Sequence, residues 1–236
     1  MNILAIETAT ETVGVAVQTT EGIRAELTLT GRRRHVESLA PAIEHLLGQV
    51  GLTVPALDTV AVDLGPGLFT GLRVGVAAAK GLAQALGAGV VGVTSLDILL
   101  RGAADTGYAG SVLAAVDARR GEVFATVGQV GPDGVTSHEA AQLWAPEALA
   151  SSLADRNGSP VLAVGDGAQR YADLLGSVDG VQVVTAILAC PPPATLLTLA
   201  LEALARGEAP VAPALVVPLY MREADARSNF AQVTRP

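Results

Sequence analysis

The sequence is poor in the residue types on which several classes of protein depend. Aromatic residues make up only 3% of its 236 positions, and Cys190 is the single cysteine. One cysteine excludes an internal disulfide, which is typical of proteins in a reducing compartment. The formal net charge of −8 argues against a broad basic surface for nucleic acid. The one basic cluster, 32–34, is interpreted as a solvated loop before a helix rather than as an RNA contact.

The sequence also has no pattern of an export signal, a membrane span or a metal site. Met1 leads into the apolar residues 3–6 without a basic leader, so we expect no signal peptide. The longest weakly charged stretch, 74–93, contains Lys80 and several glycines, and is interpreted as helix, turn and strand rather than as a span. We therefore expect a cytoplasmic protein that binds no membrane and no metal. No metal-ligand spacing occurs among the three histidines, which are His35, His45 and His138.

Half of the residues are hydrophobic, and their periodicity predicts an ordered series of elements. In the first half of the chain we expect three strands, followed by helix, strand, helix, strand and helix. The strands are expected at 2–7, 12–18, 23–30, 59–63 and 89–94, and the helices at 35–50, 70–86 and from 95 onward. Pro41 is expected to kink the first helix, because its ring removes one backbone hydrogen bond.

The same order of elements recurs in the second half. Strands are expected at 111–117, 122–129, 134–140, 161–164 and 181–185, and helices at 146–155, 168–175 and 194–206. Two tandem copies of βββαβαβα predict two ribonuclease-H-like lobes, each a mixed sheet with helices on its faces. This α/β layout resembles the actin, sugar-kinase and heat-shock ATPase superfamily, whose lobes normally hold ATP between them. We expect the first lobe at 1–105, the second at 106–212, and a tail at 213–236 whose candidate packing site is the first lobe.

The most specific local pattern is the glycine-rich segment 65–75, GPGLFTGLRVG. Its start is typical of a tight turn, and Thr70 is expected to cap the next helix, with Phe69 and Val74 as a hydrophobic staple. Free N–H groups at a helix start attract anions, but the Lys-Ser/Thr ending of a Walker loop is missing. The pattern favours a simple connection between a strand and a helix, with an anion site as the alternative. The candidate vestigial nucleotide or anion loop comprises Glu7, Thr8, Thr10, Gly65, Gly67 and Thr70.

Acidic residues end the first strand of each copy. Glu7 stands where kinases of the superfamily carry an Asp, and the turn after it contains no glycine. A Cβ in that turn hinders the approach of a triphosphate to the backbone, so we expect no cofactor beyond weak nucleotide binding. In the second copy, Asp117 and Arg119 are expected to form a cleft pair, either as an internal salt bridge or as a contact to a ligand or partner.

The helix 71–86 is apolar nearly all round, since only Arg73, Lys80 and Gln84 are polar. A helix at a solvated edge should have a polar half. Two interpretations remain open from the residues alone. The helix packs against both the sheet and a neighbouring helix of its own chain, or it forms a buried subunit interface.

Four segments together resemble the TsaB (YeaZ) family of tRNA threonylcarbamoyladenosine biosynthesis. They are the N-terminal ILAIETAT, GPGLFTGLRVG, DARRGEVF, and residues 218–222, which match P-x-Y-x-R. The resemblance spans the whole chain and implies a shortened, non-catalytic paralogue of TsaD. TsaD transfers threonylcarbamate to N6 of adenosine 37 in tRNAs that read ANN codons. Where TsaD has an H-x-x-x-H metal pair, this sequence has Ser95 and Leu99, so the metal and the transfer chemistry are expected to be lost.

The resemblance also implies partners. It predicts a scaffold that pairs with a TsaD-type catalytic subunit and a TsaE-type ATPase, forms a homodimer when alone, and meets tRNA only indirectly. The first-lobe helices supply the pairing surface in the family, so Ala79→Glu or Leu72→Glu is expected to give a folded monomer. The expected interface residues are His35, Leu39, Ile43, Leu46, Leu72, Gly75, Val76, Ala79 and Leu82. The alternatives are an ATP-dependent small-molecule kinase, a metal-dependent glycoprotease of the same superfamily, and a structural module unrelated to tRNA.

Overall fold

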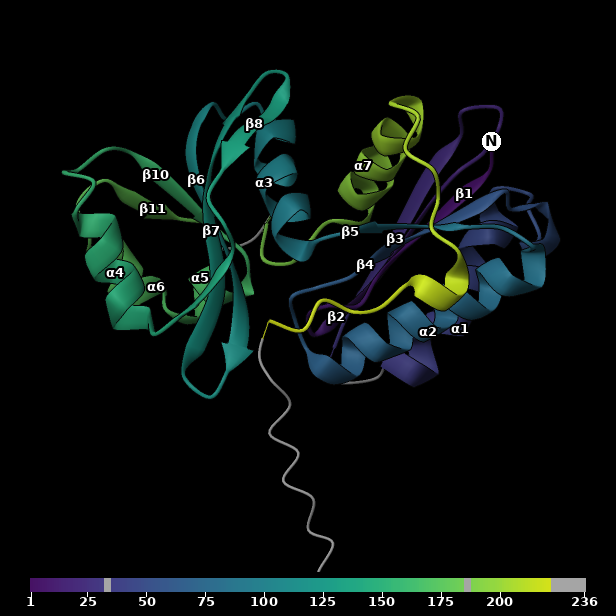
Figure 1. The fold of residues 1–236 in the computed structure, drawn as a ribbon, viewed down its shortest axis with the longest axis horizontal. Helices are drawn as coiled ribbons and strands as arrows, with labels where there is room; N and C mark the ends of the chain where they lie inside the picture. The colour runs from purple at the N-terminus through teal and green to yellow at the C-terminus, as the bar shows by residue number, and fades with distance from the viewer. Residues whose placement is uncertain (32–34, 185–187, 222–236) are drawn as a thin grey trace, which may run out of the picture.

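The protein consists of two lobes that lie side by side, each built on one β-sheet (Figure 1). The computed structural model describes residues 1–31, 35–184 and 188–221. The basic cluster 32–34 and Arg222 of the P-x-Y-x-R match lie outside the described residues. Within these ranges, no helix has both the length and the apolar character needed to cross a membrane.

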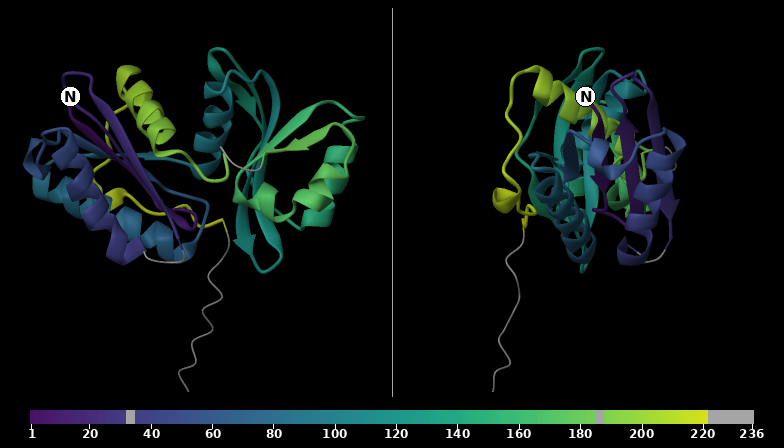
Figure 2. Two further views of the ribbon diagram at one scale, coloured as in Figure 1. Left: turned by 180° about the vertical axis from the view of Figure 1, so that it is seen from behind. Right: turned by 90° about the vertical axis from the view of Figure 1, so that its right-hand side faces the viewer.

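The first sheet has five strands in the order β3-β2-β1-β4-β5. These are β1 (Ile3–Glu7), β2 (Thr12–Gln18), β3 (Arg24–Thr30), β4 (Thr59–Asp63) and β5 (Val90–Val93). Strand β1 pairs antiparallel with β2 and parallel with β4. Alternate residues of β1 face opposite sides, so Leu4 and Ile6 pack with α1 (His35–Gln49) and α2 (Phe69–Leu86). Ile3 and Ala5 pack instead with α7 (Pro193–Ala205), and Figure 2 shows these helices on the two sides of the sheet.

The second sheet has the order β11-β10-β6-β7-β8, with β9 paired to β7. Its strands are β6 (Gly110–Arg119), β7 (Glu122–Gly131), β8 (Gly134–His138), β9 (Gln142–Trp144), β10 (Val161–Val164) and β11 (Val181–Val183). One face carries α4 (Pro146–Ala154), α5 (Asp166–Arg170) and α6 (Ala172–Gly176), and the other carries α3 (Ser95–Asp105). Two short 3-10 turns, η1 (Val54–Ala56) and η2 (Pro213–Leu215), complete the described elements.

The last helix of each copy packs on the sheet of the other lobe. The apolar side of α3, including Leu96, Leu99 and Leu100, is buried against strands of the second sheet. In return, α7 covers the first sheet. The helices therefore do not follow the expected division at 105/106, although the two sheets do separate between β5 and β6. Periodicity indicates that α3 has an apolar face, but not which sheet that face covers.

The chain after α7 returns to the first lobe. Val211 pairs with Val90 at the edge of β5, and the Leu219 N–H donates to the Leu64 carbonyl at 2.7 Å. Val216 is buried in the first-lobe core, and η2 lies beside α2 (Figure 1).

Three expected elements differ from the structure. The strand expected at 134–140 ends at His138, and the separate strand β9 was not expected; it pairs with β7 because that strand is ten residues long and extends past β8. The helix expected at 168–175 is divided at Tyr171, whose ψ of 31° is not helical. Helix α2 begins at Phe69 with Leu68 as its N-cap, so Thr70 is not the cap. Pro41 lies inside α1 on its exposed side, and the helix continues past it.

Candidate functional site

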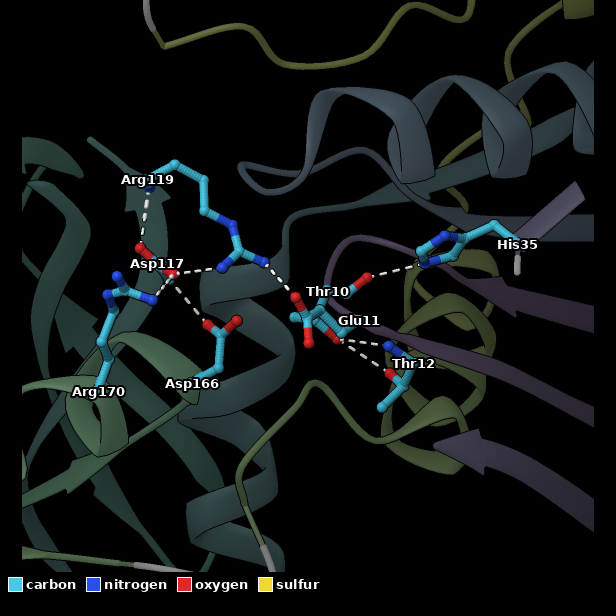
Figure 3. A network of polar contacts seen from close by, with 8 residues as sticks. All are labelled: Thr10, Glu11, Thr12, His35, Asp117, Arg119, Asp166 and Arg170. Atoms are coloured by element: carbon cyan, nitrogen blue, oxygen red, sulfur yellow. Dashed lines mark hydrogen bonds and ion pairs between the residues drawn. The ribbon is translucent and has the colours of Figure 1, made fainter. Parts of the chain in front are cut away.

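The hairpin turns of the two lobes face each other across the centre of the molecule. Arg119, at the end of β6, donates through Nη1 to Asp117 Oδ2 and through Nη2 to Glu11 Oε1, both at 2.9 Å (Figure 3). Arg119 has a φ of 62°, a left-handed conformation, and it lies where the register of β6 with β7 shifts at the end of the hairpin. The structure thus brings the expected pair Asp117 and Arg119 together as an internal salt bridge. It also adds Glu11, from the turn after β1, which the sequence did not single out.

Asp117 is the buried centre of this network. Its carboxylate is 5% exposed and accepts from the Arg119 N–H at 2.9 Å, while Arg170 Nη1 lies 3.3 Å away. The Asp117 N–H donates to Asp166 Oδ1 at 2.9 Å. Burial raises the pKa of Asp166 to about 6, although this hydrogen bond opposes the shift. The two terminal nitrogens of Arg119 therefore hold the turn and connect the lobes, while its Nε is buried without a hydrogen-bond partner among the described residues.

Two further carboxylates lie buried below the turn after β1. Glu7 accepts from the Ala9 N–H at 2.7 Å and from the Thr12 hydroxyl at 3.0 Å. Asp63, at the end of β4, accepts from the Gly65 N–H and from the Ser95 hydroxyl, each at 2.7 Å. Burial, and then the nearby Asp63 charge, raise the pKa of Glu7 well above its ordinary value. Burial raises the pKa of Asp63 to about 7. Both side chains accept from local donors, and burial shifts the pKa of each toward the protonated form.

The glycines of the segment 65–75 allow α2 and its preceding loop to pack on the turn after β1. A Cβ at Gly67 would lie 2.2 Å from the Ala9 carbonyl oxygen, and one at Gly71 would lie 2.1 Å from the Thr8 carbonyl oxygen. A Cβ at Gly75 would lie 2.2 Å from the Thr8 hydroxyl, which itself donates to the Gly71 carbonyl at 2.9 Å. These three glycines, four residues apart, therefore contact the chain's own strand β1 and the turn after it, Gly67 and Gly71 at the backbone and Gly75 at the Thr8 side chain.

This packing bears on the candidate vestigial nucleotide or anion loop, which stays a prediction. The Leu68 N–H donates to the Ala9 carbonyl, and the Gly65 N–H donates to Asp63, so two donors of the loop are used internally. Thr8 and Thr10 are buried in the same contact, while Thr70 is exposed on the first turn of α2. The loop therefore joins a strand to a helix, which the residues had favoured.

His35 has a role that the sequence did not indicate. Its Nε2 lies 2.8 Å from the Thr10 carbonyl oxygen, and its side chain is 5% exposed (Figure 3). The first residue of α1 therefore secures the turn after β1 and does not face a partner. No periodic or motif signal could have identified this contact, because it joins residues 25 positions apart.

The residues expected at the partner interface lie instead in the core of the first lobe. Leu82 is partly buried, and the other eight are buried outright. The exposed positions of these helices are different residues. They are Val36, Glu37, Ala40, Pro41, Glu44, His45, Gly48 and Gln49 on α1, and Phe69, Thr70, Arg73, Ala77, Gly81, Gln84 and Ala85 on α2. The apolar character of α2 is explained by contact with the sheet, α1 and the tail around η2. A glutamate at Leu72 or Ala79 would consequently enter the core.

The two positions where the resemblance places metal ligands are filled by structural residues. Ser95 donates to Asp63, and Leu99 is fully buried in the core on the inner face of the second sheet. In the part of the chain that the structure describes, no group of three or more His, Cys, Asp or Glu side chains could hold a metal ion. Cys190 is partly buried, and burial raises the pKa of its thiol to about 11.

Two mixed sheets, each with helices on both faces and facing hairpin turns between them, define the class of the actin, sugar-kinase and heat-shock ATPase fold. A family model described as TsaD: tRNA N6-adenosine threonylcarbamoyltransferase matches residues 16–230. The chain belongs to this family and, within it, to the TsaB (YeaZ) group, as the following relatives establish. The tRNA threonylcarbamoyladenosine biosynthesis protein TsaB of Escherichia coli (strain K12) is 32% identical over 94% of this chain and 95% of its own length.

Two further relatives agree with this assignment. TsaB of Bacillus subtilis (strain 168) is 35% identical over 52% of this chain and 53% of its own length. The solved structure of YeaZ from Pseudomonas aeruginosa is 30% identical, covers 93% of this chain and 99% of its own, and has a TM-score of 0.76. The fold class and the family that the sequence predicted are confirmed.

Proposed function

We propose that the chain is the non-catalytic scaffold subunit of a TsaD-type tRNA threonylcarbamoyltransferase. In this role it is required for transfer of the threonylcarbamoyl group to N6 of adenosine 37 in tRNAs that read ANN codons. It pairs with the TsaD-type subunit, works with a TsaE-type ATPase in the cytoplasm, forms a homodimer when alone, and meets tRNA only through the complex. The names of its relatives and the matching family model support this assignment.

The observation that carries the non-catalytic role is the packing of the segment 65–75 on the turn after β1. A kinase of this fold must admit a triphosphate to that turn. Here Gly67 and Gly71 bring the loop and α2 against the carbonyl oxygens of Ala9 and Thr8. The oxygens of Glu7 are occupied by Ala9 and Thr12. This arrangement favours a structural subunit over an ATP-dependent kinase, and no contact of the described residues favours a glycoprotease.

The proposed pairing surface is the exposed side of α1 and α2 together with the tail beside α2. Several large apolar side chains of these segments are exposed. Their exposed fractions are 73% for Val36, 50% for Phe69, 72% for Leu215, 64% for Val217 and 47% for Tyr220. Exposed apolar clusters of this kind are typical of protein–protein interfaces.

The proposal is tested by reconstitution with the TsaD-type and TsaE-type proteins of the same organism. We expect the TsaD-type subunit to co-purify with this chain and to form the modified adenosine only when the chain is added. The chain alone should transfer no threonylcarbamoyl group and hydrolyse ATP negligibly. Equal modification without the chain, or ATP turnover that scales with its concentration through successive purification steps, would contradict the proposal.

A further inference from the structure

Arg73 stacks on the Phe69 ring and bonds to the Tyr220 hydroxyl on the exposed side of α2. Its guanidinium carbon lies 3.7 Å from the centre of the Phe69 ring and 6.0 Å from the centre of the Tyr220 ring. Its Nε donates to the Tyr220 hydroxyl at 3.1 Å, and the two ring centres are 5.5 Å apart. The contact joins residues 147 positions apart in the chain, so it also fastens the tail to α2.

This arrangement fixes the direction of the guanidinium before any partner arrives. Stacking on aromatic faces and the bond from Nε restrict a side chain that otherwise loses much rotamer freedom on binding. The two terminal nitrogens remain as a forked pair of donors on an exposed residue. Among the residues that the structure describes, no carboxylate forms an ion pair with Arg73. A guanidinium whose Nε is already bonded, and whose two terminal nitrogens are not, is suited to bind the paired oxygens of a carboxylate or phosphate.

In the described part of the chain, the two segments that carry this contact contain no acid to complement Arg73. Helix α2 and the segment 209–221 have no Asp or Glu, and Lys80, the other cation of this strip, donates to the Val216 carbonyl at 2.9 Å. Among the described residues, Arg73 is thus a positive charge without an ion-pair partner, in a chain whose net charge is −8. We therefore look for its complement in another molecule. Exposed apolar neighbours favour a protein over RNA, because RNA sites gather several cations along a backbone.

We propose that Arg73, oriented by Phe69 and Tyr220, is the anchor of the pairing surface. It binds a carboxylate of the TsaD-type subunit, and apolar side chains of that subunit surround the carboxylate. The inference rests on the proposed function, because it assigns the partner group at that same surface. Arginine and tyrosine in an apolar setting are the residue types that dominate the energetics of interfaces. The fixed guanidinium supplies direction, and the apolar strip around it excludes water from the pair.

The test measures the affinity of the full chain for the TsaD-type protein of the same organism by titration calorimetry. We expect Arg73→Gln to weaken binding by about 30-fold, the effect of an interface hot spot of about 2 kcal/mol. Tyr220→Phe keeps the ring but removes the hydroxyl, so it should weaken binding several-fold. Arg206→Gln is the matched control: it removes the same charge from an exposed arginine at the end of α7, and should change binding less than twofold. All three variants should melt close to the unaltered chain.

The possible results separate the two proposals. If the unaltered chain binds the TsaD-type protein and Arg73→Gln binds equally well, the anchor is refuted and the proposed function stands. If the unaltered chain does not bind it, both fail. Binding of tRNA that weakens in Arg73→Gln, with protein binding unchanged, would assign the guanidinium to RNA and also refute the inference. A charge swap would identify the carboxylate: an acidic residue of the partner is changed to Lys, and the residue sought is the one whose change restores binding to the Arg73→Glu variant.

Discussion

The substitution of Gly71 by alanine tests whether the glycines of α2 serve contact with the turn after β1. The added Cβ would lie 2.1 Å from the Thr8 carbonyl oxygen, whereas ordinary contact begins near 3.4 Å. Helix and turn must therefore separate by more than 1 Å. Overpacking of this kind costs about 1–3 kcal/mol, and alanine returns up to about 1 kcal/mol in helix propensity. We expect a net loss of about 1–2 kcal/mol.

Gly81, ten residues further along the same helix, provides the matched control. A Cβ there meets nothing within 4 Å, so Gly81→Ala should gain about 0.5–1 kcal/mol. Urea unfolding followed by circular dichroism should move the two midpoints in opposite directions. In a chain of this size, each 1 kcal/mol corresponds to roughly 2–4 °C in the melting temperature. If Gly71→Ala is as stable as Gly81→Ala, the close packing of loop and turn is wrong, and with it the main support for a non-catalytic site.

Three further outcomes follow from the burial of particular side chains. Ala79 is fully buried in the first-lobe core, so Ala79→Glu should lower the free energy of unfolding by several kcal/mol. The protein should then be insoluble or unfolded by circular dichroism. A folded monomer in sedimentation would contradict this. Because burial raises the pKa of Asp63 from 3.8 to about 7, the folded state holds a proton that the unfolded state releases, and the melting temperature should fall as pH rises from about 4 to 7. Asp63→Asn should flatten that slope, and an unchanged slope would count against the assignment. Glu11→Gln should lower the stability by less than about 1 kcal/mol, because the side chains of Glu11 and Arg119 are 47% and 33% exposed. Asp117→Asn should lower it more in the same thermal assay, because the Asp117 side chain is only 5% exposed. Equal losses in the two variants would argue against a buried centre at Asp117.

Most of the fold could be predicted from periodicity, because each regular element has one face in a core. The alternation in β1 and the helical spacing in α1 indicated both element type and buried face. Periodicity could not show which core receives a face. For this reason the exchange of α3 and α7 between lobes was missed, and so was β9, three residues long, whose pairing depends on the length of β7.

The candidate site shows the same limit at the level of single residues. Small residues at Gly71 and Gly75 correctly indicated that another backbone comes close to α2, but spacing cannot identify that backbone. It belongs to the turn after β1 of the same chain, through the oxygens of Thr8. The stripe of small residues therefore faces inward, and the exposed residues of α2 include ones that interrupt it, such as Arg73. Arg73 was noted only as an exception in an apolar helix. Its meaning depends on Tyr220, 147 positions away, and becomes visible only when the tail returns to lie beside α2.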